Sequence, residues 1–312
     1  MAFGAVTGEG ALWSAGNLDE GMTLSMTQQS MTSEVVAVIL VNYESGEDLV
    51  SAIWSLVQLK RAPDVFIVVD NASEDDSLHL AQIDFPQLVV IHNAENVGFA
   101  KAVNQGVRKA REFRTTHVWL FNPDARARND ALSELILAAR NMPLALFSPI
   151  IFDNEGKVWF SGGKLSWWRM RAFHRKVSCF QERGQEFLTG CALFIPLATI
   201  DVIGEFDENY FLYYEDADFC LRAKKAGFQL CMVPKAAVDH TEASRTYARK
   251  VYYLVYSGLL FFFKHASGMK AGYMRTYVTI RKLKNWIDCL LFGGEEAALV
   301  RQAYVDFFRR IR

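Results

Sequence analysis

The chain of 312 residues is 51% hydrophobic and 22% charged, which provides ample material for a core and argues against a disordered chain. Its 34 basic and 35 acidic residues leave a net charge of −1, which argues against a chain-wide electrostatic surface for nucleic acid. Five cysteines without metal-finger spacing indicate buried thiols in a reducing compartment, and no apolar run reaches the ~18 residues that cross a bilayer. We therefore expect a cytoplasmic protein.

The first part of the chain alternates between strand and helix patterns. Residues 1–33, rich in Gly, Ser, Thr and Met, show no sustained period and predict a flexible leader. Val35–Val41 is an apolar, β-branched run of strand length, and similar runs predict strands that begin near residues 65, 88, 118 and 144. Helical spacing separates these runs, and Ser73 is the expected cap of the helix over residues 78–83. This order predicts an α/β fold with a mostly parallel central sheet and helices on both faces.

The second part of the chain is less regular. Between residues 152 and 195, paired glycines and paired tryptophans suggest an irregular or antiparallel segment laid over the sheet. A helix is expected after Asp216 and ends before Gly227, and two short strands are expected at 230–233 and 236–238. From residue 249 onward the pattern predicts two or three amphipathic helices.

The end of the chain is basic and rich in aromatic residues. From Arg245 to Arg312 it holds 13 basic and 4 acidic residues. This composition fits a negatively charged surface, with membrane lipid as the first candidate. An equally weighted alternative is that these helices pack on the rest of the protein or on another subunit, in a homo-oligomer.

Polar residues collect where the predicted strands end. They are Asn42-Tyr43-Glu44, Asp70-Asn71 and Asn122-Pro123-Asp124. Each cluster alone is also explained by a turn or a helix cap, because Asp, Asn and Ser favour both. The carboxyl ends of parallel strands, however, meet at one edge of a sheet, where ligands bind. The chain has neither the glycine-rich dinucleotide fingerprint nor a P-loop, which argues against a dinucleotide-dependent dehydrogenase and a P-loop NTPase.

A second polar constellation lies further along the chain. Three carboxylates, Glu215, Asp216 and Asp218, follow two tyrosines and open a predicted helix. Acidic residues complement a helix N-terminus, but that effect accounts more easily for one of them than for three. A carboxylate held near aromatic side chains and other carboxylates can act as a general base. His240 ends the last predicted strand, where it is either structural or, with a nearby Asp, a ligand of a divalent metal.

Taken in order, these segments resemble a known family. The motifs VNYES, VVDNAS, ENVGFAKAVN, LFNPDA, LTGCALFIP, GEFDENYFLYYEDADFCLRAKKAG and a following VDH are similar to those of the inverting family-2 glycosyltransferases. The resemblance is strongest to bacterial rhamnosyltransferases of O-antigen and related polysaccharide synthesis, and it runs from about Val35 to Ser244. It implies the GT-A, Rossmann-like fold for nucleotide-diphosphate sugars, with a catalytic domain at 34–245 and a helical extension at 246–312.

The resemblance also implies a donor site. Tyr43 and Asp70 match positions that hold the nucleobase, and Asp70 is expected to accept a ring N–H. Three further residues match the segment beside the ribose and the diphosphate: Asn96, Lys101 and Asn104. Asn122 and Asp124 stand in place of the metal-binding DxD motif. The expected cofactor is Mg²⁺ or Mn²⁺, with Asp124 as its carboxylate ligand and His240 as a second ligand.

The resemblance implies an acceptor side and a catalytic base as well. Asp216 matches the base that removes the proton of the acceptor hydroxyl. Glu215 and Asp218 are expected to orient the loop and its helix, with Arg222 paired to one of them. Three residues are expected on the acceptor side: Gly190, Cys191 and Tyr214.

We therefore expect a glycosyltransferase that moves L-rhamnose from dTDP-rhamnose to a saccharide, itself expected to be lipid-linked, at the cytoplasmic face of the inner membrane. A UDP-hexose or UDP-N-acetylhexosamine donor is the alternative within the same family. A sugar nucleotidyltransferase is disfavoured because the first strand is not followed by a Gly- and Arg/Lys-rich triphosphate loop. A non-enzymatic saccharide-binding scaffold is disfavoured because Asp124 and Asp216 are both present.

Overall fold

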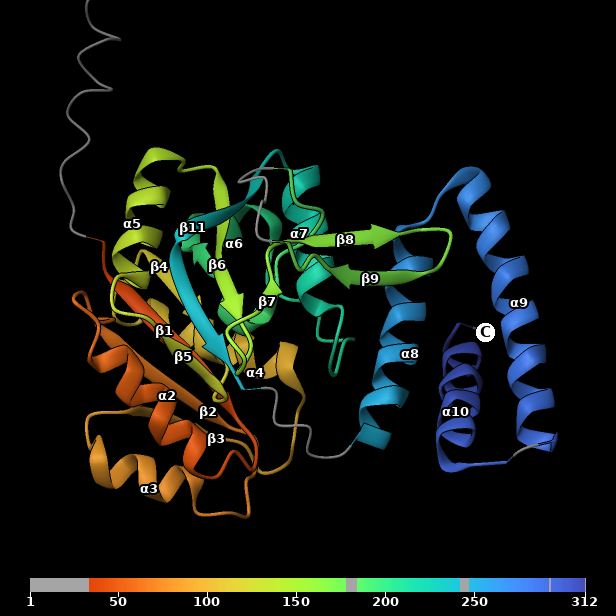
Figure 1. Cartoon of the computed structure of the whole chain (residues 1–312), viewed down its shortest axis with the longest axis horizontal. Helices are drawn as coiled ribbons and strands as arrows, with labels where there is room; N and C mark the ends of the chain where they lie inside the picture. The colour runs from red at the N-terminus through yellow and green to blue at the C-terminus, as the bar shows by residue number, and fades with distance from the viewer. Residues whose placement is uncertain (1–33, 178–183, 242–246, 292, 312) are drawn as a thin grey trace, which may run out of the picture. The chain divides into compact units, whose positions relative to one another are not determined.

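The computed structural model describes residues 34–177, 184–241, 247–291 and 293–311. The leader expected at residues 1–33 lies outside the described residues. The fold is α/β, with a large mixed sheet at its centre (Figure 1). Within the described residues this sheet has nine strands, and most of them follow the order β3-β2-β1-β4-β10-β6-β11-β5.

The first half of the sheet is parallel. β1 (Val36–Asn42) lies between β2 (Val65–Asp70) and β4 (His117–Leu120), and β3 (Val89–His92) forms the edge beside β2. All three pairings are parallel, as the alternation of strand and helix predicts. The register sets Asn42 opposite Asp70, so the polar residues at the ends of β1 and β2 are neighbours.

The second half of the sheet is mixed. β10 (Phe194–Pro196) runs antiparallel between β4 and β6 (Ala145–Phe152), so the predicted parallel order is interrupted there. β11 (Gln229–His240) pairs with β6 in parallel. The sequence predicts two strands here, but the structure has one, with an irregularity in its pairing between Val233 and Ala237. Two short antiparallel strands complete the sheet: β5 (Ala125–Ala127) and β7 (Val158–Phe160).

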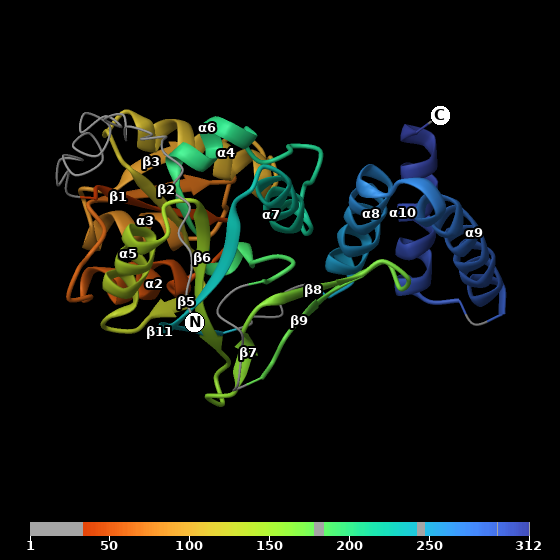
Figure 2. The same cartoon turned by 90° about the horizontal axis from the view of Figure 1, so that it is seen from above.

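Helices cover both faces of the sheet. α2 (Glu47–Val57) and α5 (Ala131–Asn141) lie on one face, and α4 (Phe99–Arg111) and α6 (Leu197–Ile203) lie on the other (Figure 2). α3 (Ser77–Asp84) packs beside α2. The cap predicted at Ser73 is wrong: α3 starts after Asp76, and Ser73 has other partners, described below.

The segment between β7 and β11 contains the second set of candidate residues. Its hairpin consists of β8 (Gly163–Ser166) and β9 (Arg171–His174), which pair antiparallel, as expected for this region. The 3₁₀ turn η1 (Gly190–Ala192) comes just before β10, and α7 (Glu215–Lys225) comes just before β11.

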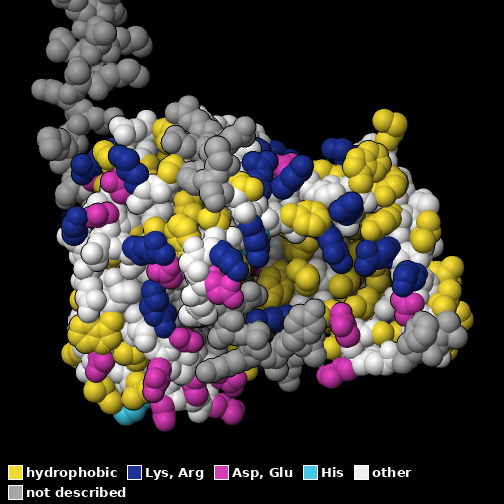
Figure 3. Space-filling model, in the orientation of Figure 1, with side chains coloured by type: hydrophobic (Ala, Val, Ile, Leu, Met, Phe, Trp, Pro, Cys, Tyr) yellow, Lys and Arg dark blue, Asp and Glu magenta, His cyan; other side chains and the backbone are white. Residues whose placement is uncertain are grey.

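Three helices form the C-terminal region: α8 (Tyr247–His265), α9 (Gly268–Leu291) and α10 (Glu295–Arg310). α10 packs against both α8 and α9. In the described part of the chain, none of the helices is both long enough and apolar enough to traverse a bilayer. Hydrophobic and basic side chains lie together over this helical region on the face shown in Figure 3.

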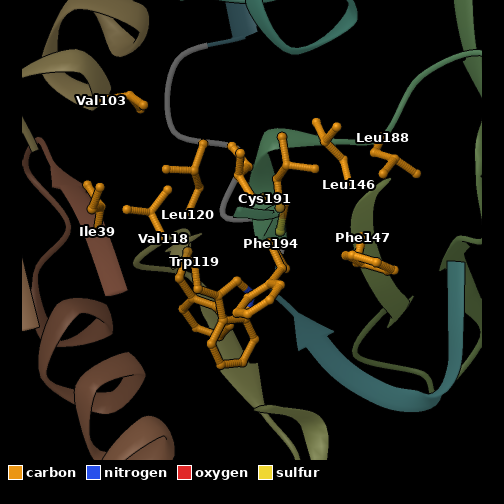
Figure 4. Close-up of a cluster of buried hydrophobic side chains, with 14 of the residues drawn as sticks. Ile39, Val103, Val118, Trp119, Leu120, Leu146, Phe147, Leu188, Cys191 and Phe194 are labelled. Carbon is orange, nitrogen blue, oxygen red and sulfur yellow. The ribbon is translucent and has the colours of Figure 1, made fainter. Parts of the chain in front are cut away.

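The core fills the space between the sheet and its helices. Figure 4 shows part of it, where Val103 of α4 faces Ile39 of β1 and Trp119 of β4 lies near Phe194 of β10. All four side chains are at most 1% exposed. Because strands and helices are locked together here, the loops at the carboxyl ends of β1, β2 and β4 are held on a rigid support.

Candidate active site

A cavity of about 300 Å³ lies at the carboxyl ends of β1, β2 and β4. The loops after these strands, the start of α4 and the segment before α7 contribute to its wall. Its lining residues include Tyr43, Asn71, Asn96, Asn122, Asp124 and Phe211. Four of them are candidates from the sequence (Tyr43, Asn96, Asn122 and Asp124), so polar clusters that are far apart along the chain meet in one hollow.

The loop that carries Tyr43 is fixed by a hydrogen-bond network. Tyr43 lines the cavity and is 43% exposed. Asp70 is buried, and its carboxylate accepts hydrogen bonds from Asn42 Nδ2 (2.8 Å) and from the backbone N–H of Ser73 (3.2 Å). Ser73 Oγ in turn accepts from the backbone N–H of Glu44 at 3.0 Å. Asp70 therefore lies in the network that supports the loop.

The start of α4 forms another wall of the cavity. Asn71 Nδ2 donates to the carbonyl of Gly98 (3.3 Å), and Asn96 Oδ1 accepts from the Gly98 N–H (3.0 Å). Gly98 has φ +84°, and a Cβ there would lie 2.6 Å from the carbonyl oxygen of Phe211. Only glycine fits, so the N-terminus of α4 can approach the segment before α7. The positive end of the helix dipole at such an N-terminus favours a negatively charged group, such as a phosphate.

Two donor-site candidates on α4 are placed away from the cavity wall. Lys101 is exposed in the first turn and does not line the cavity. Asn104 is buried and exchanges two hydrogen bonds with the backbone of Phe206, at 2.9 and 3.0 Å. Its amide also donates to Glu208 Oε1 at 3.1 Å. Asn104 thus ties α4 to the loop before α7, and the structure does not bring it to the cavity.

Asp124 and His240 form a pair in which His240 is buried and Asp124 is partly exposed to the cavity. β11 lies antiparallel to β5, which aligns His240 with Ala125 and brings His240 Nε2 to 3.1 Å from Asp124 Oδ1. Thr241 donates to the Asp124 carbonyl through its N–H (2.9 Å) and through its hydroxyl (2.7 Å). Burial lowers the pKa of His240, but Cys191 and the Asp124 carboxylate outweigh burial and raise it to about 10.

This pair fits one part of a divalent-metal site. His240 Nδ1 is a buried atom that lacks a hydrogen-bond partner within the described residues, and Asp124 Oδ1 is a buried oxygen that lies beside His240 Nε2. Among those residues, no three His, Cys, Asp or Glu side chains converge as a complete ligand set. Mg²⁺ and similar ions commonly bind through one or two protein ligands and complete their shell with substrate phosphates and water. A carboxylate and an imidazole beside this cavity match that donor set, and because Cys191 and Asp124 raise the pKa of His240, a metal ion would have to displace the proton of the ring.

The turn η1 connects this pair to the carboxylates of α7. The carbonyl of Cys191 accepts a hydrogen bond from the N–H of Asn122 at 2.9 Å. The N–H of the preceding residue, Gly190, donates to Asp216 Oδ2 at 2.9 Å. Cys191 itself is 4% exposed, so it contributes backbone rather than a free side chain. Residues 190 and 191 therefore fix Asp216 relative to the Asn122–Asp124 loop.

The two adjacent carboxyl groups at the start of α7 share an apolar environment. Glu215 is 5% exposed, and its Oε2 lacks a hydrogen-bond partner in the described part of the chain. Burial, with the neighbouring Asp216 charge, raises the pKa of Glu215 well above its ordinary value. Burial also raises the pKa of Asp216, and the N–H groups of Gly190 and Ala217 offset part of that rise. Asp216 therefore has the N–H donors that stabilise an ionised carboxylate, whereas Glu215 Oε2 has none within the described residues.

Asp218 has a different environment, because it lies among cations. Its fully buried carboxylate contacts Arg222 Nε (2.8 Å), Lys264 Nζ (2.6 Å) and His265 Nε2 (2.7 Å). Burial alone raises the pKa of Asp218, but these partners lower it far below its ordinary value. Of the two carboxylates expected to orient the helix, Asp218 is the one that pairs with Arg222. Since Lys264 and His265 belong to α8, this cluster joins α8 to α7.

Tyr214, expected on the acceptor side, is packed against α8. It is 7% exposed, and its ring lies 5.5 Å from that of Phe261. Its hydroxyl accepts a hydrogen bond from the Ala172 N–H at 3.3 Å. The backbone at Tyr213 and Tyr214 has φ +68° and +67°, a strained conformation for residues with a Cβ. The strain lies directly before the first residue of α7, Glu215, and the contact with α8 holds it in place.

Comparison with known proteins identifies the family. The model of the family described as "Glycosyl transferase family 2" matches residues 37–197. The chain belongs to glycosyltransferase family 2. The match includes the whole cavity wall contributed by β1, β2, β4 and α4, and the resemblance seen in the sequence is thereby confirmed.

Two characterised members of this glycosyltransferase family have similar sequences. The "N-acetylglucosaminyl-diphospho-decaprenol L-rhamnosyltransferase" of Mycobacterium tuberculosis is 27% identical over 240 residues, which cover 69% of this chain and 78% of the relative. The "dTDP-rhamnosyl transferase RfbF" of Shigella flexneri is 22% identical over 213 residues, which cover 67% of this chain and 70% of the relative.

A solved structure extends the fold comparison to almost the whole chain. The mannosyltransferase PcManGT from Pyrobaculum calidifontis, in complex with GDP-Man and Mn²⁺, aligns with a TM-score of 0.56 over 90% of this chain and 89% of its own. Sequence identity is 13%, so this similarity concerns the fold. The GT-A fold expected for this glycosyltransferase is confirmed.

The structure adds residues that the sequence analysis did not assign to the site. Asn71 lines the cavity, although only its neighbour Asp70 was expected to take part in donor binding. Phe211 lines it as well, and its carbonyl accepts from the Phe99 N–H at 2.7 Å. Asn71 directly follows a strand, and from that position its place in the cavity wall could have been predicted. The sequence offers no signal for Phe211, because its contact with α4 spans more than a hundred residues.

Proposed function

We propose that this family-2 glycosyltransferase is an inverting, divalent-metal-dependent rhamnosyltransferase. In this proposal it moves L-rhamnose from dTDP-rhamnose to a saccharide carried on a lipid diphosphate, in the synthesis of a cell-surface polysaccharide. The names of the two relatives support the sugar, the nucleotide and the acceptor class. The observation that carries the mechanism is the turn η1, which holds Asp216 through Gly190 and the Asn122–Asp124 loop through Cys191.

The donor is proposed to occupy the cavity at the ends of β1, β2 and β4. Tyr43 provides an aromatic surface at one part of the wall, where a nucleobase can stack. Asn71 and Asn96 offer amide groups to the ribose, and the N-terminus of α4 faces the diphosphate. Asp70 keeps the Tyr43 loop in shape and retains lone pairs on both oxygens for a base N–H.

Asp124 and His240 are proposed to hold Mg²⁺ or Mn²⁺ beside the diphosphate. Such an ion, when bound, neutralises negative charge that develops on the leaving phosphate oxygen. The similar mannosyltransferase is in complex with Mn²⁺ as well as its nucleotide sugar, which supports this assignment. Asn122 places its side chain on the same wall and is suited to a hydrogen bond with a phosphate or sugar oxygen.

Asp216 is proposed as the catalytic base. Its ionised carboxylate accepts the proton of the acceptor hydroxyl while the hydroxyl oxygen attacks C1 of rhamnose. The bond between C1 and the phosphate oxygen breaks in the same displacement, and dTDP leaves with the electron pair. A single displacement from the opposite face inverts the anomeric centre. The raised pKa of Asp216 makes this carboxylate a better proton acceptor than an exposed Asp.

Thermal unfolding in the presence of nucleotides tests this assignment. A ligand that binds only the folded protein raises the melting temperature by mass action. We expect dTDP with Mn²⁺ to raise it, UDP and GDP to raise it less, and Asp124→Ala to remove the Mn²⁺-dependent part. Asp130→Ala is the matched control, because Asp130 is an exposed aspartate that pairs with Lys60.

The same experiment decides between donors. A larger shift with UDP than with dTDP would replace rhamnose with a hexose or N-acetylhexosamine donor. No shift with any nucleotide would contradict the proposal of a nucleotide-sugar site. Turnover of dTDP-rhamnose with a lipid-linked N-acetylglucosamine acceptor then tests the complete reaction.

A further inference from the structure

One side of α9 exposes a regular series of mostly hydrophobic side chains. They recur at alternating intervals of four and three residues, which keeps them on one side of a helix. We call them the α9 stripe: Met269, Tyr273, Thr276, Ile280, Leu283, Ile287 and Leu290. All seven are exposed, and Met269 (94%), Leu290 (64%) and Ile280 (61%) are the most open.

The opposite side of α9 is fixed to the protein. Met274 and Val278 are each 1% exposed, and Val278 belongs to a small core with Leu259 of α8 and Phe307 of α10. The stripe therefore points away from the other helices. A contiguous apolar surface of this kind on a folded protein indicates a binding surface.

Tryptophans extend the exposed surface at both ends. Trp168, at the tip of the β8–β9 hairpin, is 63% exposed, and its ring packs 4.7 Å from Tyr273. The Tyr273 hydroxyl donates to the Trp168 carbonyl at 2.9 Å, which fixes the hairpin to the stripe. Trp286, near the other end, is 48% exposed. Trp and Tyr concentrate where a membrane meets water, because one end of each side chain is apolar and the other is polar.

The charges of α9 indicate which kind of partner this surface binds. The helix has five basic residues and one acidic residue, Asp288, which pairs with Lys284 at 2.6 Å. The positions that flank the stripe are Lys270, Gly272, Tyr277, Thr279, Lys284 and Trp286. A second copy of α9 packed through the stripe would offer Lys270 and Lys284 no acidic partner at these positions. Anionic lipid headgroups supply the missing negative charge.

We propose that α9 docks the protein on an anionic lipid bilayer. The helix lies along the surface, with the α9 stripe, Trp168 and Trp286 in the interfacial layer and its basic residues among the headgroups. The docking surface is argued from α9 itself and stands apart from the donor site. Its use, to bring the active site to a lipid-linked acceptor, rests on the proposed function.

Co-sedimentation of the full chain with vesicles tests the docking. We expect binding to vesicles of phosphatidylcholine mixed with phosphatidylglycerol, and weak binding to phosphatidylcholine alone. The double variant Ile280→Ser/Leu283→Ser is expected to reduce the partition coefficient at least about 10-fold. Arg275→Gln/Lys284→Gln is expected to reduce it about 10-fold on the anionic vesicles, and high salt is expected to have the same effect.

Matched controls separate docking from folding and from donor binding. Leu137→Ser/Val202→Ser removes two apolar side chains of α5 and α6 that are 50% and 65% exposed, and it is expected to bind vesicles like the unmodified chain. The melting temperature of each variant, with and without dTDP and Mn²⁺, shows whether the fold and the donor site remain. Retained dTDP stabilisation with lost vesicle binding is the expected result for the stripe variant.

Two results would overturn the proposal. One is equal vesicle binding by the unmodified chain and the stripe variant. The other is an unmodified chain that is dimeric by light scattering, fails to bind vesicles and becomes monomeric in Ile280→Ser/Leu283→Ser. That result would assign the stripe to a second copy of the chain, while the donor site could still respond to dTDP.

Discussion

At the scale of single residues, two aspartates two positions apart have opposite environments. Asp216 accepts one N–H from η1 at 2.9 Å and has a raised pKa because of burial. Asp218 contacts Arg222, Lys264 and the ring of His265, and it has a lowered pKa. This contrast supports the proposed role of Asp216 in proton transfer and indicates a structural role for Asp218, because a carboxylate held by Arg222 and Lys264 is a weak proton acceptor.

The first prediction concerns Asp216. Asp216→Asn keeps the size and the hydrogen-bond acceptor for Gly190 but removes the proton-accepting oxygen, so we expect kcat to fall by about 10³-fold. Stabilisation by dTDP with Mn²⁺ is expected to be unchanged. Single-turnover kinetics and thermal unfolding measure the two effects. Normal turnover by this variant would show that Asp216 is not the catalytic base.

The second prediction is the pH dependence that follows from the raised pKa values. Asp216 must be ionised to act, so kcat is expected to rise with pH, with a midpoint above the ordinary Asp value of ~3.9. Above pH ~4 the unfolded chain has lost the protons of Asp216 and Glu215, whereas the folded protein still holds them. The contribution of these two groups to the free energy of unfolding therefore falls as pH rises from ~4 through their raised folded pKa values. Glu215→Gln is expected to keep the acidic limb of kcat, because Asp216 has the N–H donors from Gly190 and Ala217 that stabilise its ionised form. If the acidic limb of kcat shifts in Glu215→Gln, the carboxyl group whose ionisation controls kcat is Glu215 rather than Asp216.

Residue chemistry alone predicted part of the site. Tyr43, Asn122 and Asp124 follow strands directly, and the register of parallel strands brings them to one cavity. Asn104 has the same residue type as Asn96 and Asn122, which line the cavity, yet its amide faces the backbone of Phe206. Whether a helical side chain faces the cavity depends on the segment that packs against the helix. For Asn104 that segment contains Phe206, 102 residues further along the chain, so the local sequence does not predict the contact.

At the scale of elements, α8 acts as a brace for the loop before the catalytic carboxylates. Tyr253 of α8 stacks on Phe211, with ring centroids 4.6 Å apart. Ser257 Oγ donates to the Leu212 carbonyl at 2.7 Å. Phe211 and Leu212 both line the donor cavity, so the C-terminal helices contribute to the shape of the site although they do not line it.

The third prediction follows from this brace. Tyr253→Ala removes the stacking, which is worth about 1 kcal/mol beyond its area. We expect the affinity for dTDP with Mn²⁺ to fall about five-fold, because Phe211 loses its support. Calorimetric titration measures the affinity. Leu254→Ala is the matched control, since Leu254 is the next residue of α8 and is 51% exposed. An equal loss in both variants would show that α8 acts through general stability.

The elements that the sequence predicts well are long or strongly patterned. β1, β2 and α4 were expected from unbroken apolar runs and helical spacing, and their pairing followed from the alternation of strand and helix. The sequence did not predict β10, because a strand of three residues is too short to show a period. Its antiparallel direction between β4 and β6 depends on how the chain crosses back over the sheet, which local sequence does not show. β11 was divided in two because Pro234 and Lys235 interrupt its apolar pattern where the pairing shifts.

At the scale of the whole molecule, the Asp218 cluster unites the catalytic helix with the C-terminal region. Arg222, which pairs with Asp218, also donates to the carbonyls of Ile203 (2.7 Å) and Glu205 (2.8 Å). Lys264 reaches Asp207 (2.7 Å) as well as Asp218. The buried Asp218 carboxylate and its partners therefore link four parts of the chain: the end of α6, the loop after it, α7 and α8. We expect them to unfold together.

The last prediction is the cost of removing that charge. Asp218→Asn leaves Lys264 and Arg222 facing a neutral amide, and breaking a buried pair of this kind costs about 3 kcal/mol. Asp239→Asn is the control, because Asp239 forms an exposed pair with Arg128 whose loss costs less than ~1 kcal/mol. The contribution of Asp218 is present at every pH above ~4, since its folded pKa is lowered, and it disappears only as pH falls below that value. Urea unfolding from pH 2 to 8 measures both variants. Equal loss of stability in the two variants would mean that the cluster is no more than another surface ion pair, and that α8 is held to α7 by its aromatic contacts alone.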